Sequence, residues 1–182
     1  MIVNTRIPCL MLALVAARGA GAAHLAAQGP RFNVGGGVTV PVGGYGTNDG
    51  AGWHLLGAAL VRVSAPLALR VDAMYGRTPR QGLEIGHTWL WGGTASIVWR
   101  LPRAEPTLRP YLLTGLGIYT VGVVRAGIPS TSRTGVAWSG GGGLSFLGVG
   151  PAIGFVEARF ITIRTSGGAT NLFPISAGFV LR

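Results

Sequence analysis

The chain has 182 residues, of which 32 are glycine, and only 11% of its residues are charged. Its net charge of +10 comes from 15 basic residues, all of them arginine, against 5 acidic residues. The lack of lysine excludes the P-loop and Ser-x-x-Lys motifs. The arginines form neither a cluster along the sequence nor a basic helix face, which argues against a nucleic-acid partner.

Residues 1–27 have the composition of a cleavable secretory signal. The basic residue Arg6 precedes an apolar run over residues 7–17, and small residues follow it. We expect cleavage between residues 22 and 27. Because Cys9 lies within this segment, the mature chain is expected to contain no thiol and no disulfide. We expect residues 28–182 to form one domain.

Eight stretches of the remaining chain alternate apolar with small or polar residues at a period of two, which is typical of β-strands. In the third stretch, Leu69 and Val71 fall on one side, whereas Arg70 and Asp72 fall on the other. Such rows describe a barrel with a lipid-facing exterior and a mixed interior. The sequence therefore predicts an all-β fold, an eight-stranded antiparallel up-and-down transmembrane β-barrel. Its expected strands are residues 32–42, 53–63, 67–75, 88–101, 111–123, 136–147, 156–160 and 173–181.

Aromatic residues are expected to mark the two membrane interfaces, where tryptophan and tyrosine are enriched. Trp89 and Trp99 fall on one face of the fourth stretch, spaced to lie roughly 25 Å apart along the membrane normal. The fifth stretch is apolar on both sides, and we expect its Tyr111, Leu113 and Tyr119 to face lipid. The predicted aromatic girdle is Trp89, Trp99, Tyr111, Tyr119 and Trp138.

The connections between the stretches indicate an orientation. Residues 43–52, 76–87 and 124–135 are long and rich in Gly, Ser, Thr and Arg, whereas residues 64–66, 102–109 and 148–153 are shorter. Long external loops and short periplasmic turns are the outer-membrane pattern. We therefore expect both termini in the periplasm and a monomer. Guanidinium groups bind phosphate in a bidentate manner, so surface glycolipid is an expected partner of the loop residues Arg77, Arg80, Arg125 and Arg133.

Short sequence motifs carry a resemblance to a known family. They are residues 110–119 (PYLLTGLGIY), 155–160 (FVEARF) and 174–179 (PISAGF). With them the chain resembles the small outer-membrane protein β-barrel domain, the class with the OmpA-like transmembrane barrel. The resemblance covers nearly all of the mature chain and implies a barrel, not an activity. It also implies insertion by the outer-membrane assembly machinery, which in the family reads a C-terminal aromatic residue; Leu181 and Arg182 occupy that place here.

Four charged residues are expected to point into the barrel. Arg70 and Asp72 share one face of their strand, and Glu157 and Arg159 share one face of another. The lumen of an eight-stranded barrel is filled by side chains, and buried charges must pair. We expect a charge network that fixes the structure, and a gate opened by re-pairing of these groups is the alternative.

An enzyme is the rival class of function. Asp49, His54, His87, Ser130 and Ser132 could gather at the outer rim, but no G-x-S-x-G elbow is present. The two histidines lack partners at metal-ligand spacing. We therefore expect no catalytic, cofactor or metal site. The predicted role is structural or surface-interactive in the outer membrane, with a narrow pore for small or lipophilic solutes as the alternative and a lipid-modifying enzyme as a weaker one.

Overall fold

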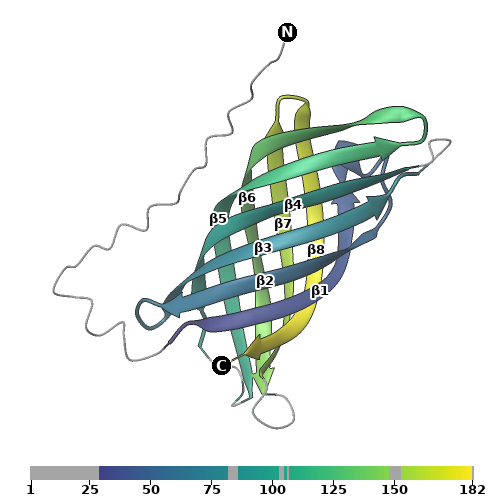
Figure 1. Cartoon of the computed structure of the whole chain (residues 1–182). Coiled ribbons are helices and arrows are strands. Elements are labelled where there is room, and N and C mark those ends of the chain that lie inside the picture. The colour runs from purple at the N-terminus through teal and green to yellow at the C-terminus, as the bar shows by residue number, and fades with distance from the viewer. Residues whose placement is uncertain (1–28, 82–85, 103–104, 106, 148–152, 182) are drawn as a thin grey trace.

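The stretches of the sequence that alternate apolar with small or polar residues form the strands of one closed β-sheet. The computed structural model describes residues 29–81, 86–102, 105, 107–147 and 153–181, so the expected signal segment lies outside the described residues. Each strand pairs antiparallel with its neighbours in sequence, and β8 closes on β1, as Figure 1 shows. The predicted eight-stranded antiparallel up-and-down barrel is confirmed. Its elements are β1 (Arg31–Val42), the short 3-10 helix η2 (Gly43–Tyr45), β2 (Gly52–Arg62), β3 (Leu67–Pro79), β4 (Gly86–Arg100), β5 (Leu108–Arg125), β6 (Ile128–Leu147), β7 (Ile153–Thr165) and β8 (Gly168–Leu181).

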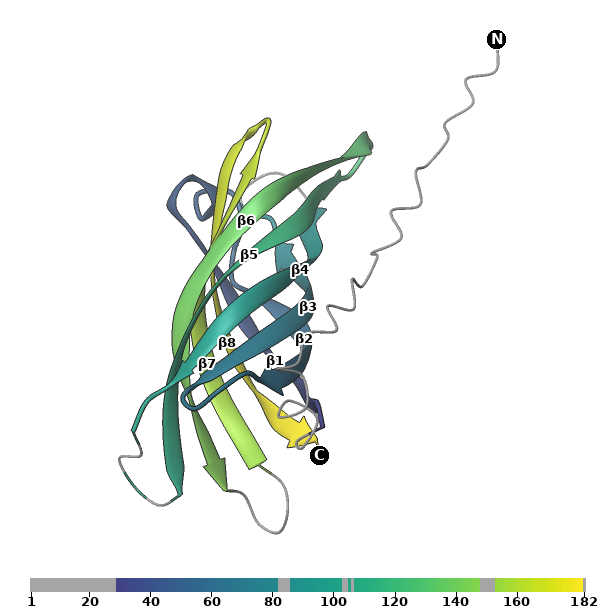
Figure 2. The same ribbon diagram turned by 90° about the vertical axis from the view of Figure 1, so that its left-hand side faces the viewer.

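The barrel has two distinct ends. At one, which we call the terminal end, β1 begins and β8 ends. At the other, the hairpin end, β1 connects to β2, β3 to β4, β5 to β6 and β7 to β8 (Figures 1 and 2). No helix in the described part of the chain is long and apolar enough to cross a membrane.

Outward rows of apolar side chains run along the strands. In β3 exposed and buried residues alternate without a break from Leu67 to Pro79. Leu69 is 53% exposed and Val71 is 62% exposed, while the intervening Arg70 is buried. The predicted facing is confirmed for β1, β2, β3, β4, β7 and β8.

The prediction for β5 is wrong. Tyr111, Leu113 and Tyr119 are buried inside the barrel, and Leu112, Leu116 and Ile118 face outward. Large rings fit inside because glycine stands opposite them. A Cβ on Gly92 would lie 2.5 Å from the ring of Tyr119, and one on Gly143 would lie 2.6 Å from the hydroxyl of Tyr111. Neither tyrosine therefore belongs to an aromatic girdle.

The connections at the hairpin end also differ from the prediction. Residues 124–135, expected as a loop, are mostly strand, with a tight turn at Ala126 and Gly127 between β5 and β6. Residues of β6 before Val136 pair with β5 but not with β7. They form a projecting hairpin, visible at the upper right of Figures 1 and 2. Pairing with β5 satisfies the backbone N–H and C=O groups of these residues. The polar segment therefore forms strand without an apolar face to bury.

Buried apolar residues fill the lumen on both sides of its charged centre. Toward the terminal end lie Ala68, Val98, Tyr111 and Leu113. The larger cluster extends toward the hairpin end and includes Met74, Leu90, Tyr119, Ile161, Ile163 and Leu172. On β3, Ala68 precedes and Met74 follows the charged pair, so the charges lie between two apolar layers.

Candidate functional site: a charge network inside the barrel

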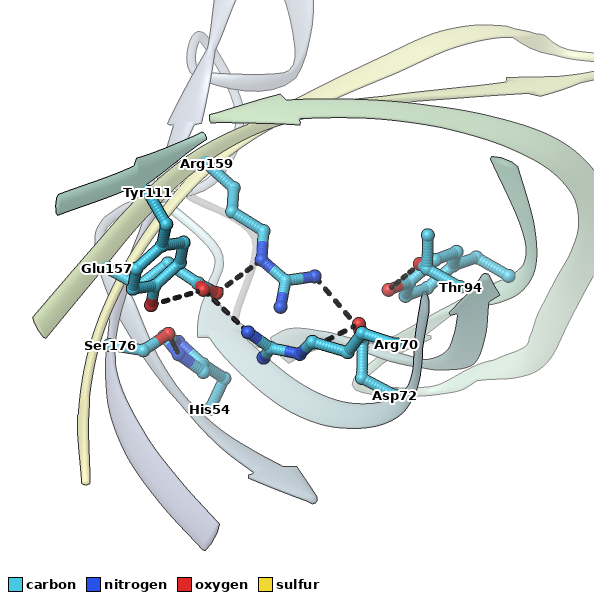
Figure 3. A network of polar contacts seen from close by, with 9 residues as sticks. His54, Arg70, Asp72, Thr94, Tyr111, Glu157, Arg159 and Ser176 are labelled. Carbon is cyan, nitrogen blue, oxygen red and sulfur yellow. Dashed lines mark hydrogen bonds and ion pairs between the residues drawn. The ribbon is translucent and has the colours of Figure 1, made fainter. Parts of the chain in front are cut away.

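Two strands on opposite sides of the lumen bring four charged side chains together. Arg70 and Asp72 are separated by one outward residue of β3, as Glu157 and Arg159 are in β7, and all four side chains are at most 5% exposed. Figure 3 shows the four side chains meeting across the barrel. The structure thus brings together all four residues that the sequence placed in a lumen network.

Each carboxylate contacts both guanidinium groups. Arg70 Nη1 donates to Glu157 Oε2 at 2.6 Å, and Arg159 Nε donates to Glu157 Oε1 at 2.5 Å. Arg159 Nη1 also donates to Asp72 Oδ1 at 2.9 Å, and Arg70 Nε lies 3.5 Å from Asp72 Oδ2. Two positive and two negative groups therefore form a ring with no net charge. Neutral pairing of this kind is the condition under which charges remain buried.

Tyr111 extends this network, which the sequence analysis missed. Its hydroxyl donates to Glu157 Oε2 at 2.8 Å, so Glu157 accepts from three side chains on three strands. Because Tyr111 was expected to face lipid, its hydroxyl had no predicted partner. Once Tyr111 is known to be buried, its hydroxyl itself indicates a polar partner in the lumen, since a buried tyrosine OH usually forms a hydrogen bond.

His54 lies inside the barrel and not at the outer rim. Its Nδ1 is 2.9 Å from Thr39 Oγ1, and its Nε2 is 2.7 Å from Ser176 Oγ. His54 is 1% exposed, so these polar contacts hold a buried histidine. Of the other residues considered for catalysis, Ser130 and Ser132 are exposed on β6, and the structure does not bring them to His54.

The remaining rim residues form two separate groups. His87 Nδ1 lies 3.0 Å from Arg77 Nη2 at the start of β4. Asp49 is buried, accepts from Thr78 at 3.2 Å and lies 3.8 Å from Arg80 Nη1. Next to Asp49, burial raises the pKa of Tyr45 to about 12. Among the described residues, no group of three His, Cys, Asp or Glu side chains gathers as a metal site.

The four arginines expected in loops lie mainly in strands. Arg77 is in β3, Arg125 in β5 and Arg133 in β6, while Arg80 forms an isolated bridge with Asp49. Arg77 and Arg133 are exposed at the hairpin end. Both are therefore held on strand backbone at the hairpin end.

Three of the predicted girdle residues lie on the outer surface. Trp99 and Trp138 are 53% and 49% exposed, and Trp89 faces the same side of β4 as Trp99. Trp53 and Tyr75, which were not assigned to the girdle, also face outward, with ring centroids 5.7 Å apart. The alternation of apolar and polar residues in β2 and β3 already indicates that both side chains face outward.

Comparisons with known proteins reveal the same fold in solved structures. Neisserial surface protein A (NspA) is 18% identical with a TM-score of 0.66, over 85% of this chain and 97% of that one. Ail, the attachment invasion locus protein of Yersinia pestis, is 18% identical with a TM-score of 0.54, over 85% and 100%. The outer membrane protein OprG from Pseudomonas aeruginosa is 12% identical with a TM-score of 0.59, over 84% and 95%. A second structure of Ail, in complex with the heparin analogue sucrose octasulfate, has a TM-score of 0.50 at 17% identity.

Sequence comparison adds no assignment: no family model and no curated protein matches the chain. At these identities the similar structures show the fold alone. The likeness to NspA extends over 85% of this chain. The chain is an eight-stranded antiparallel β-barrel of the kind found in small outer-membrane proteins.

Proposed function

We propose that the chain is an integral outer-membrane barrel with a closed lumen and a structural or surface-interaction role. The observation that carries the proposal is the exposed apolar exterior. Val71, Leu116, Ile118 and Val136 are each more than 60% exposed, and they lie on three different strands. Contiguous apolar surface on this scale is unfavourable in water, whereas a bilayer is its natural solvent.

The two ends of the barrel suggest how it is oriented. Its hairpins project at one end, and the first and last strands have their free ends at the other (Figure 2). In outer-membrane barrels the longer segments are external and the short turns periplasmic. We place the hairpin end outside the cell and both termini in the periplasm, with insertion by the outer-membrane assembly machinery.

The refolded chain is expected to be electrically silent in a planar bilayer. The charge network and two apolar layers occupy the narrow lumen, and opening a path would require re-pairing buried ions, which is costly. Single-channel recording on protein shown to be folded tests this. Discrete steps whose size changes in Glu157→Gln would instead support the pore alternative.

The outward arginine at the hairpin end supports a glycolipid partner. Arg77 of β3 pairs in register with Trp53 of β2 and Trp89 of β4, both tryptophans facing outward. A guanidinium between interfacial rings lies at the depth of lipid phosphates. We therefore assign the contact with surface glycolipid to Arg77 first, with Arg80, Arg125 and Arg133 further along the same end. That Ail binds a sulfated heparin analogue is consistent with polyanion recognition on this fold.

Arg77→Gln is expected to weaken binding to vesicles containing lipopolysaccharide about threefold to tenfold, because a charge-assisted hydrogen bond to phosphate contributes roughly 1–2 kcal/mol. The measurement is a titration of the barrel reconstituted in phosphatidylcholine with added lipopolysaccharide. Arg164→Gln is the matched control, because Arg164 is an exposed arginine of β7 whose neighbours in register, Val136 and Ala169, are not aromatic; it should bind as the unmodified chain does. Equal loss in both variants would contradict the assignment.

A further inference from the structure

A cavity opens at the terminal end of the barrel. It has a volume of about 80 Å³ and is lined by residues from all eight strands. Five arginines line it: Arg31 of β1, Arg62 of β2, Arg70 of β3, Arg100 of β4 and Arg109 of β5. The described lining residues include no aspartate or glutamate. The cavity therefore concentrates guanidinium groups from five successive strands in one place.

The fold holds these charges together although they repel each other. Arg100 is half-buried, and the charges of Arg62, Arg31 and Arg109 act on it from the neighbouring strands. In surroundings less polar than water, like charges at short range repel each other more strongly than in water. An anion in the cavity would be attracted by Arg100 and by the guanidinium groups on the neighbouring strands, so the cavity has the electrostatics of an anion site.

The floor of the cavity supplies a second observation. Arg70 lines the cavity and is 2% exposed. Its Nη1 is taken by Glu157, whereas its Nη2 is buried and has no hydrogen-bond partner in the described structure. Leaving a buried donor without an acceptor is unfavourable. An acceptor oxygen placed in the cavity would satisfy it.

The walls of the cavity are mainly apolar, whereas its floor and mouth carry arginines. Phe155 of β7 is buried, and Val98, Ile153 and Val180 join it around the cavity. Tyr111 also contributes to the wall, although its hydroxyl is taken by Glu157. Apolar walls lower the local polarity, which strengthens a charge-assisted hydrogen bond.

We propose that this cavity is a binding site for a phosphate group, held by Arg62, Arg100 and Arg109 at the mouth and by Arg70 at the floor. Guanidinium groups match phosphate oxygens geometrically and form bidentate pairs with them. The volume of about 80 Å³ admits a single phosphate group. The site is at the opposite end from the glycolipid contact and does not depend on the membrane role proposed above.

Inorganic phosphate is the first probe. Titrated calorimetrically into the full chain refolded in zwitterionic detergent, it is expected to bind at one site, and Arg100→Gln is expected to raise the Kd at least about tenfold. Arg164→Gln is the matched control, because Arg164 is an exposed arginine of β7 near the hairpin end. It should leave the Kd unchanged.

Two sources of the phosphate group are distinguished by a second probe. Dihexanoyl phosphatidic acid, used as monomers, carries a phosphate with short acyl chains. If it binds more tightly than inorganic phosphate and loses affinity in Arg100→Gln, the site takes a phospholipid headgroup. If the two probes bind equally, the site takes free phosphate or a soluble ester.

The test of the phosphate site does not depend on the refolding of any single variant. Arg62→Gln and Arg109→Gln remove other mouth residues and replace Arg100→Gln if that variant does not refold. In the unmodified chain, the ¹⁵N Nε resonances of the cavity arginines should shift with phosphate while that of Arg164 does not. The proposal is overturned if the unmodified chain binds neither probe at millimolar concentration, or if Arg100→Gln and Arg164→Gln bind phosphate equally.

Discussion

Glu157→Ala is expected to lower the free energy of unfolding by about 3–5 kcal/mol, the usual cost of removing one partner from a buried ion pair. Glu157 accepts hydrogen bonds from Arg70, Arg159 and Tyr111. Without it, two guanidinium groups in the lumen share the single carboxylate of Asp72. The change therefore leaves an uncompensated positive charge between two apolar layers.

Urea unfolding of the chain refolded into vesicles measures this effect. Glu105→Ala is the matched control, because Glu105 is an exposed glutamate between β4 and β5, and it should change the stability by no more than about 0.5 kcal/mol. An unfolding midpoint of Glu157→Ala equal to that of the control would show that the network does not stabilise the barrel.

A double variant separates charge balance from contact loss. Removing Arg70 and Glu157 together leaves Arg159 and Asp72, which are paired at 2.9 Å. Charge is then balanced again, and apolar replacement of a buried pair is often close to neutral. The Arg70→Met and Glu157→Met double variant is therefore expected to be more stable than Glu157→Met alone.

The charge network could be predicted from the sequence because alternation is strict around it. In β3 none of the outward residues from Leu67 to Tyr75 is charged, so the inward position of Arg70 and Asp72 follows from the period alone. Which side chains meet across the lumen depends on register between strands that are distant in sequence. That the four charged residues pair with one another was inferred from the cost of unpaired buried charge, whereas the contact of Glu157 with Tyr111 was not predicted.

The facing of β5 could not be predicted, because period two carries no information when both faces are apolar. Leu112, Leu116 and Ile118 alternate with Tyr111 and Tyr119. The deciding fact is the space opposite each face: Gly92 on β4 and Gly143 on β6 leave room for the two rings inside. Cross-strand register supplies that fact, and one sequence alone does not.

The cavity at the terminal end could not be predicted from the sequence either. The alternation in β2 and β4 gives Arg62 and Arg100 inward positions, but Arg31 and Arg109 stand near strand ends, where the pattern stops. Curvature of the sheet into a closed barrel brings the five arginines of β1 to β5 to one opening. A basic cluster formed this way leaves no run of charge along the chain.

Tyr119→Ala is expected to destabilise the barrel by about 3–5 kcal/mol, the cost of truncating a fully buried aromatic ring. Tyr119 is 0% exposed and packs within the larger apolar cluster. Its ring covers Gly92, and its hydroxyl lies 3.0 Å from Thr94 Oγ1. Truncation leaves a cavity inside a narrow lumen and removes the partner of a buried threonine.

Tyr75→Ala is the matched control, since Tyr75 is an outward tyrosine that is 43% exposed and contacts Trp53. Losing one aromatic pair costs only about 0.5–1.5 kcal/mol. If β5 instead faced lipid with Tyr119, the two variants would be equally mild. The difference between their unfolding free energies, measured in the same vesicles, therefore reports directly which face of β5 fills the barrel.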